Sequence, residues 1–437
     1  MNLHSRLCAN LIEHLKNIIF SQDFLNQNRK SHKNFTRNRK LPFHLLIFFL
    51  LNFVKGSYQD ELDNFFKALN RTDVAERVVS KAALTKARMK LKSEVFIELN
   101  RHLNSFFYEH FNTKTWFGHR LVAFDGSTVR LPHIEDITKH FGTWKGSKGE
   151  PCPLARVSQM FDSLNKISID AIITPNKTGE RELVVKHCQN LLPNDLSLLD
   201  RGYPASWLFK LILFRGANFC ARISWKQWNI VKRFYYSGCK EKIINLSIIG
   251  VSKKKCLDLK LDIEPMKLRL IRVELDTGEV EILITSLIDS NTYPHDVFME
   301  LYHQRWPVEE DYKAMKCWLE LENFSGKSTL SIYQDFHAKV FSKNVTSVLA
   351  FPTQEVVKKD TANRKYAYQI NFAQAISKTK DVIILLFQRT KKKIIRLISN
   401  LQHIFAQTVE PIRPGRKYPR NHKLSRRKFF MNYKSVA

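Results

Sequence analysis

Residues 116–224 carry the pattern that most restricts how this chain can fold. Short apolar or alternating runs, which are typical of strands, lie at 121–124, 155–161, 167–173 and 196–199. A helical pattern at 180–192 separates the third run from the fourth, and a further strand is expected at 217–223. Strands that are followed by a helix and then by more strands predict a mixed α/β sheet.

The sequence on both sides of this region has a different pattern. Residues 1–115 show helical periodicity, and helical patterns return after Pro294. The segment between is strand-rich, and its runs 267–275 and 280–287 flank DTGE, a hairpin turn. We therefore expect an α+β protein with a helical N-terminal domain at 1–115, an α/β core at 116–224 and 294–350, an inserted all-β subdomain at 225–293, and a helical, basic C-terminal region at 351–437.

Basic residues greatly outnumber acidic ones. The 437 residues include 71 Lys and Arg against 41 Asp and Glu, a formal net charge of +30. Such an excess indicates a polyanionic partner, with nucleic acid the first candidate, although some basic proteins bind only RNA or acidic partners weakly. Residues 28–40 have six basic residues and no acid, and residues 389–437 have 14 against one acid. The first stretch is either a solvated loop or an arm that contacts phosphates.

The cysteines and the apolar runs exclude several classes of protein. Seven cysteines are scattered with no two closer than 17 residues, which argues against a disulfide framework and a CxxC zinc site and fits a reducing compartment. The most apolar run, 41–54, has 14 residues and includes His44 and Asn52. Because a spanning helix needs about 20 apolar residues, we expect a buried helix with Pro42 near its first turn, and no membrane partner.

Two aspartates follow predicted strands. Asp125 comes after LVAF and Asp200 comes after LSLL. Open α/β sheets place their sites at such strand ends, where two carboxylates could form a hard, oxygen-only site for a divalent metal. Aspartate also commonly ends strands and starts turns, so either residue alone could be structural.

A third acid is selected by helical geometry. If the helix at 302–316 is continuous, one narrow stripe carries Tyr302, Arg305, Glu309 and Lys316. Glu310 and Asp311 point away from this stripe, and an adjoining apolar stripe can dock the helix on the sheet. Pro307 should kink the helix or begin its second segment. The alternative is an amphipathic surface helix with i,i+4 charge pairs.

Together these motifs resemble the D-D-E transposases of bacterial insertion sequences, in the subgroup with the Y-R-E-K signature. The resemblance rests on LVAFDGS, LLDRGY and the spacing Tyr302-x2-Arg305-x3-Glu309-x6-Lys316. It extends over roughly 80–345 to ARVSQMFD, to Gly179-Glu180-Arg181 and to FCARIS. It implies a ribonuclease-H-like core, a mixed five-stranded sheet with flanking helices, with a β insertion between the second Asp and the Glu.

The resemblance also implies roles for the site residues. Asp125, Asp200 and Glu309 would bind two Mg²⁺ ions, for which Mn²⁺ would substitute, and two such ions serve both sides of an in-line displacement. Arg305 and Lys316 would clamp DNA phosphates, while Tyr302 would donate to a phosphate or pack the DNA end.

Three further residues have weaker signals. Arg201 either contacts phosphates or pairs with a structural acid. Trp225 and Trp228 could stack on an extruded base near the cleavage site, although tryptophan more often simply packs.

The predicted function is that of a cytoplasmic, nucleoid-associated bacterial DNA transposase. Residues 1–115 would bind the terminal inverted repeats of the element, and the C-terminal region would pair two subunits as a homodimer in a synaptic complex. The double-stranded DNA partners are the element ends and the target. Two alternatives remain: a metal-dependent structure-specific nuclease, or a catalytically silent DNA-binding regulator derived from a transposase.

Overall fold

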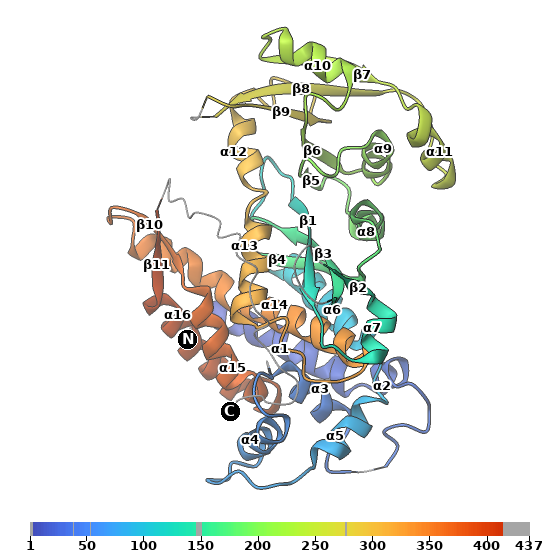
Figure 1. Ribbon diagram of the computed structural model, residues 1–437. Helices are drawn as coiled ribbons and strands as arrows, with labels where there is room; N and C mark the ends of the chain where they lie inside the picture. Colours follow the sequence, from blue (N-terminus) through green and yellow to red (C-terminus); the bar gives the residue numbers. More distant parts are fainter. Residues whose placement is uncertain (1–2, 38, 53, 146–150, 276–277, 414–437) are drawn as a thin grey trace. The chain divides into compact units, whose positions relative to one another are not determined.

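The computed structural model describes residues 3–37, 39–52, 54–145, 151–275 and 278–413 (Figure 1). Residues 414–437 of the basic tail predicted at 389–437 therefore lie outside the described residues. The chain divides into two compact units that are not continuous in sequence. The first unit comprises Met1–Asn112, Val129–Ala155 and Lys313–Ala437, and the second comprises Thr113–Thr128 and Arg156–Tyr312.

The first unit is a helical assembly around one long helix, α14 (Thr329–Asp360). Ser328 caps α14 by accepting the backbone N–H of Ser331, and most of the helix is buried, as expected when other helices cover it on several sides. The surrounding helices are α1 (Leu3–Phe20), α2 (Gln22–Asn28), α3 (Phe43–Leu51), α4 (Tyr58–Asn70), α5 (Lys81–Arg88), α6 (Glu94–His110), α7 (Glu135–Phe141), α15 (Phe372–Gln388) and α16 (Lys391–Gln407). A small antiparallel pair, β10 (Ala367–Ile370) and β11 (Val409–Ile412), completes the unit.

Two of these helices illustrate how the unit holds together. The apolar run around 41–54 forms α3, with Pro42 at its N-cap, and its side chains are buried as predicted. No helix among the described residues is long and apolar enough to cross a membrane. Helix α1 packs on α16, where the buried Ser5 hydroxyl donates to the Gln402 side chain over 2.7 Å.

The second unit is built on a mixed sheet. Its core strands follow the order β4-β3-β1-β5-β6, and β1 pairs parallel with β5, as β5 does with β6. The elements are β1 (Leu121–Arg130), β3 (Cys152–Asp162), β4 (Ile167–Pro175), α8 (Glu180–His187), the 3₁₀ turn Cys188–Asn190, β5 (Leu196–Leu199), α9 (Ser206–Phe214) and β6 (Asn218–Ile223). The N-terminal end of β3 lies in the first unit, where it pairs with the short β2 (Thr143–Trp144). The mixed five-stranded core predicted from the sequence is confirmed.

The insertion continues the same sheet. Strand β9 (Val280–Thr285) pairs antiparallel with β6, β8 (Met266–Glu274) with β9, and β7 (Glu241–Leu246) with β8. The predicted hairpin at 267–287 is therefore present. The insertion is not all-β, however, because it also contains α10 (Asn229–Tyr236) and α11 (Gly250–Asp258). Each is at most nine residues long and buries only one or two side chains, which leaves little periodicity to detect.

The segment 294–318 is not one continuous helix. It consists of α12 (Val297–His303), α13 (Pro307–Lys313) and a π-helical turn (Ala314–Trp318). Pro307 begins the second segment, because its ring cannot continue the hydrogen-bond ladder of α12. The predicted four-residue stripe is corrected accordingly: Tyr302 lies on α12, Arg305 in the connecting turn and Glu309 on α13, whereas Lys316 lies in the π-turn and in the first unit.

Candidate active site

Asp125 and Asp200 lie at the same edge of the parallel strands. Strand β1 continues through Asp125, but its pairing with β5 ends at Ala123, opposite Leu198. Two residues further along that register, Asp125 falls opposite Asp200, which directly follows β5. Adjacent strands are about 4.8 Å apart, so the register brings the two aspartates into one site.

Asp125 experiences the charge of both other predicted acids. The pKa of Asp125 is raised to about 6, first by burial and then by the negative charges of Glu309 and Asp200, while the Gly126 N–H and the positive charge of Arg305 oppose the rise. The three carboxylates therefore form one electrostatic cluster with incompletely balanced negative charge.

Asp200 has the opposite balance. Burial alone would raise its pKa, but the backbone N–H of Arg201 and the positive charges of Arg305 and Arg222 outweigh burial and hold the pKa below its usual value. The Arg222 guanidinium donates to Asp200 over 2.7 Å and also binds Glu281 on β9. Arg222 belongs to the FCARIS motif, yet sequence reasoning did not identify it as a site residue. Its second partner, Glu281, lies on a neighbouring strand that only the fold brings close.

Glu309 is joined to the cluster through Arg305. The Nη2 atom of Arg305 donates to Glu309 over 2.7 Å. Arg305 is only 2% exposed, and among the described residues its Nε and Nη1 atoms have no hydrogen-bond partner. Tyr302 is also buried, and its hydroxyl lies 3.4 Å from both Asp200 and the Leu199 carbonyl. Burial raises the pKa of Tyr302, so it remains a hydrogen-bond donor at neutral pH.

Helix α13 is fixed against the sheet by two side chains next to Glu309. The Tyr312 hydroxyl donates to the backbone carbonyl of Asp125 over 3.1 Å. The Gln159 amide on β3 donates to Asp311 over 2.8 Å. Asp311, which helical geometry had placed away from the acids, therefore serves to dock the helix.

A series of hydrogen-bonded side chains ends at the backbone carbonyl of Asp125. His187 on α8 is hydrogen-bonded to Asp170 over 2.8 Å and to the Ser158 hydroxyl over 3.0 Å, and Ser158 in turn donates to the Asp125 carbonyl over 3.4 Å. Ser158 and His187 are fully buried. No substrate can reach this serine, so the chain is a support for β1 and not a hydrolytic triad.

Comparison with known proteins identifies the family. A family model described as a transposase DDE domain matches residues 116–345, more than half of the chain. The chain belongs to this transposase family. It is 20% identical over 392 residues to the transposase InsG for insertion sequence element IS4 of Escherichia coli (strain K12), covering 88% of this chain and 86% of that protein. Among solved structures, the piggyBac transposase in a synaptic complex with hairpin DNA matches with a TM-score of 0.41 and 11% identity, covering 92% of this chain and 81% of that chain.

Three residues predicted for the site of this transposase are exposed or pack on other neighbours. For a fourth, Lys316, which lies in the π-helical turn after α13, the phosphate contact stays a prediction. Arg201 is exposed and, among the described residues, forms no ion pair; its backbone N–H is the part that meets Asp200. Trp225 stacks on Tyr235 with ring centroids 5.2 Å apart, and Trp228 packs edge-to-face on the core residue Phe209. For these tryptophans the packing interpretation describes the contacts observed.

The donors of the transposase site suit a hard divalent cation. All three acids offer carboxylate oxygens, the ligands that Mg²⁺ prefers. The pKa of Asp125 is raised mainly by burial and in smaller part by the charges of Glu309 and Asp200, and a cation would offset both causes. Two of the acids are bound to arginines, Asp200 to Arg222 and Glu309 to Arg305. Within the described residues, no group of three acidic, histidine or cysteine side chains is arranged to hold one ion. Loading a metal would therefore require these carboxylates to exchange arginine for the cation.

Proposed function

We propose that this transposase cuts DNA at the ends of its insertion sequence and joins those ends to target DNA at Asp125, Asp200 and Glu309. The observation that carries the proposal is the electrostatic coupling of these three carboxylates at one sheet edge, within the matched transposase domain. A protein that only bound DNA would gain nothing from placing three carboxylates together where DNA phosphates bind.

Mg²⁺ is the proposed cofactor, held by these three carboxylates as two ions, and it would supply the charge needed to activate the attacking oxygen and stabilise the leaving oxygen. The chain's own residues hold the DNA for this chemistry. Among the described residues, the Nε and Nη1 donors of Arg305 have no hydrogen-bond partner, and because both are buried, they would reach a phosphate oxygen only after the side chain moved. Arg222 and Tyr302 keep Asp200 in place through their contacts with it.

The proposed partners are the double-stranded element ends, the target DNA and a second copy of the chain. The proposal assigns the terminal repeats to residues 1–115, with the basic stretch 28–40 on phosphates, and subunit pairing to the helices after 351. A cytoplasmic, nucleoid-associated location would follow from DNA as the substrate.

The test is a Mg²⁺-dependent assay on labelled DNA that carries the element's own flanking ends. Wild-type protein should nick at the element boundary and then join the freed end to target DNA, and Asp125→Ala should do neither. Cutting without joining would replace the proposal with a structure-specific nuclease. Salt-sensitive binding without cutting in any divalent metal would replace it with a regulator.

A further inference from the structure

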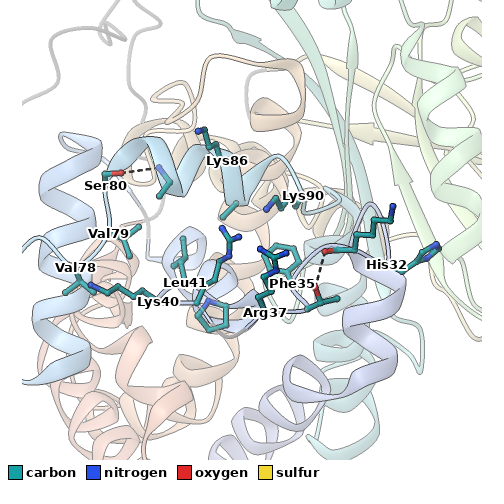
Figure 2. Close-up of a pocket in the computed structure, with 16 residues that line it drawn as sticks. His32, Phe35, Arg37, Lys40, Leu41, Val78, Val79, Ser80, Lys86 and Lys90 are labelled. Carbon is teal, nitrogen blue, oxygen red and sulfur yellow. Dashed lines mark hydrogen bonds between the residues drawn. The ribbon is translucent and has the colours of Figure 1, made fainter.

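A cavity of about 730 Å³ lies in the first unit between the basic stretch 28–40 and helix α5 (Figure 2). One wall is formed by residues 32, 33, 35–37 and 39–42, and the other by Val78–Ser80 and the face of α5 that carries Ala83 and Ala87. This volume is in the range of sites that enclose a small ligand or one unit of a polymer. None of the acids of the candidate active site takes part in it.

The lining of the cavity is strongly cationic. It includes no acidic residue, and its six fully charged side chains are Lys33, Arg37, Arg39, Lys40, Lys86 and Lys90. In the described part of the chain, none of these six forms a salt bridge. Six like charges around one space repel each other, and a bound polyanion would relieve this repulsion.

The floor of the same cavity is apolar. Leu41 and Val79 are buried beneath it, and Pro42 and the two alanines of α5 add further apolar surface. A site for inorganic phosphate alone would have no use for such a floor. The combination of cations with apolar surface matches a ligand that has both phosphates and a flat ring.

Phe35 supplies an aromatic ring to this cavity. Its ring is half-buried and meets Phe43 edge-to-face, with centroids 5.5 Å apart. The backbone of Phe35 has φ of 60°, the left-handed region, where a bulky residue is a rare exception. Strained residues of this kind concentrate at sites that bind ligands.

We infer that this cavity binds an unpaired nucleotide, with its phosphates on the cations and its base against Phe35 and the apolar floor. A DNA duplex could lay its backbone across the cations, but its bases stay stacked inside the helix and would leave the floor unfilled. The inference deepens the role proposed for residues 28–40 and rests on it, but it requires no catalysis. The nucleotide could belong to a single DNA strand or be free in solution, and these two sources share the same chemistry.

The experiment measures binding by full-length protein in EDTA, so that cleavage does not interfere. A fluorescent ten-nucleotide single strand is titrated by anisotropy, with competition by the matching duplex, by deoxythymidine monophosphate and by pyrophosphate. Phe35→Gly removes the ring and suits the left-handed backbone, and Phe35→Tyr retains a ring. Lys86→Gln/Lys90→Gln removes two cations of the cavity, and Lys253→Gln/Lys254→Gln removes two exposed cations of α11 as a matched control.

Phe35→Gly should weaken single-strand binding roughly tenfold, as expected for loss of one base–aromatic stack, and leave duplex binding within about twofold. Phe35→Tyr should restore it. The double variant in the cavity should weaken binding and reduce its dependence on salt more than the control does. Competition by the monophosphate would identify a free nucleotide as the source, and competition by strands alone would identify DNA.

Wild-type single-strand affinity in Phe35→Gly, with an unchanged thermal midpoint, would overturn the inference. Equal competition by pyrophosphate would also overturn it, because the site would then recognise phosphate alone. The Asp125→Ala variant separates this result from the proposed function. It should lose cleavage but bind single strands like wild type. Loss of cleavage therefore says nothing about the cavity, and a cavity that does not bind nucleotides says nothing about cleavage.

Discussion

Two buried arginines, one in each unit, show how the same side chain can serve structure or function. In the first unit, every guanidinium nitrogen of Arg88 has an acceptor: Nε donates to Gln334 over 2.6 Å, Nη1 to Tyr58 and Ser325, and Nη2 to Asp335 and the Ser331 carbonyl. In the second unit, Arg305 has a single hydrogen-bond partner, Glu309, and two nitrogens without one among the described residues.

The difference lies in how completely each arginine is satisfied. Buried polar groups are nearly always hydrogen-bonded, so a complete set, as at Arg88, marks a structural network. Unused donors beside a cluster of acids mark a place where another group is expected to bind. Arg305 is therefore assigned to ligand binding and Arg88 to stability.

The assignment of Arg305 to ligand binding is tested most directly at Glu309, its carboxylate partner. Glu309→Gln should reduce cleavage by about 10³-fold or more, because the neutral amide neither ligates Mg²⁺ well nor balances the arginine. DNA binding should stay nearly intact or tighten. The matched control is Glu310→Gln, an exposed neighbour on the same helix, which should leave cleavage unchanged. Equal loss of DNA binding in Glu309→Gln would count against a metal-ligand role.

At Arg88 the expected loss is in stability. Arg88→Met should lower the free energy of unfolding by about 3–5 kcal/mol, because it leaves the Asp335 carboxylate buried without its counter-ion, with only the Ser325 N–H and hydroxyl, among the described residues, donating to it. Urea unfolding measures this loss. Protein that remains folded should cleave DNA at a normal rate per active molecule. An unchanged free energy of unfolding would show that the hydrogen bonds of Arg88 do not stabilise the fold.

The matching substitution in the other unit is Arg305→Met. We expect cleavage to fall about 10²-fold, as is typical for the loss of one donor to a developing charge. Stability should change by no more than about 1 kcal/mol, because replacing a buried ionic group by an apolar one is often nearly neutral and the Glu309 side chain can reach water. A loss of unfolding free energy as large as that of Arg88→Met would show that Arg305 also has a structural role, and the two arginines would not differ.

The smallest effect is on stability against pH. The pKa of Asp125 is raised to about 6 in the folded chain, so the folded state retains a proton that the unfolded state releases, and stability falls as pH rises from about 4 to 6. Asp125→Asn should therefore stabilise metal-free protein by about 1–3 kcal/mol at pH 7.5 and hardly at all at pH 4. Asp136 is the control, because the Thr329 backbone N–H lowers its pKa, so Asp136→Asn should give no gain at pH 7.5. A gain at pH 4 as large as at pH 7.5 would exclude the proposed charge penalty.

Sequence reasoning located the acids because their signals are local. Asp125 and Asp200 follow recognisable strands, and the parallel register then brings them together. Glu309 was selected from three successive acids by the spacing of a continuous helix, and its role stays a prediction. The structure breaks that helix at Pro307 and places the Asp311 side chain against Gln159. The proline at 307 already indicated that a second helical segment could begin there.

The features that were missed depend on contacts between distant parts of the chain. Arg222 meets Glu281 across β6 and β9, and His187 meets Ser158 from a different element. The π-turn that contains Lys316 follows no sequence period, so the expectation of one continuous helix through this lysine was wrong. The cavity of the first unit forms because α5 lies beside the basic stretch 28–40. Neither segment carries a sequence signal that predicts this contact.

The contact between α1 and α16 has a consequence for how the protein is made. Helix α16 is synthesised long after α1, so the apolar face of α1 stays uncovered until the segment that carries Gln402 has been made. A product that stopped before residue 391 would still contain Asp125, Asp200 and Glu309, but its first helix would lack this cover. Premature termination should therefore leave an exposed apolar helix face, which favours aggregation over folding.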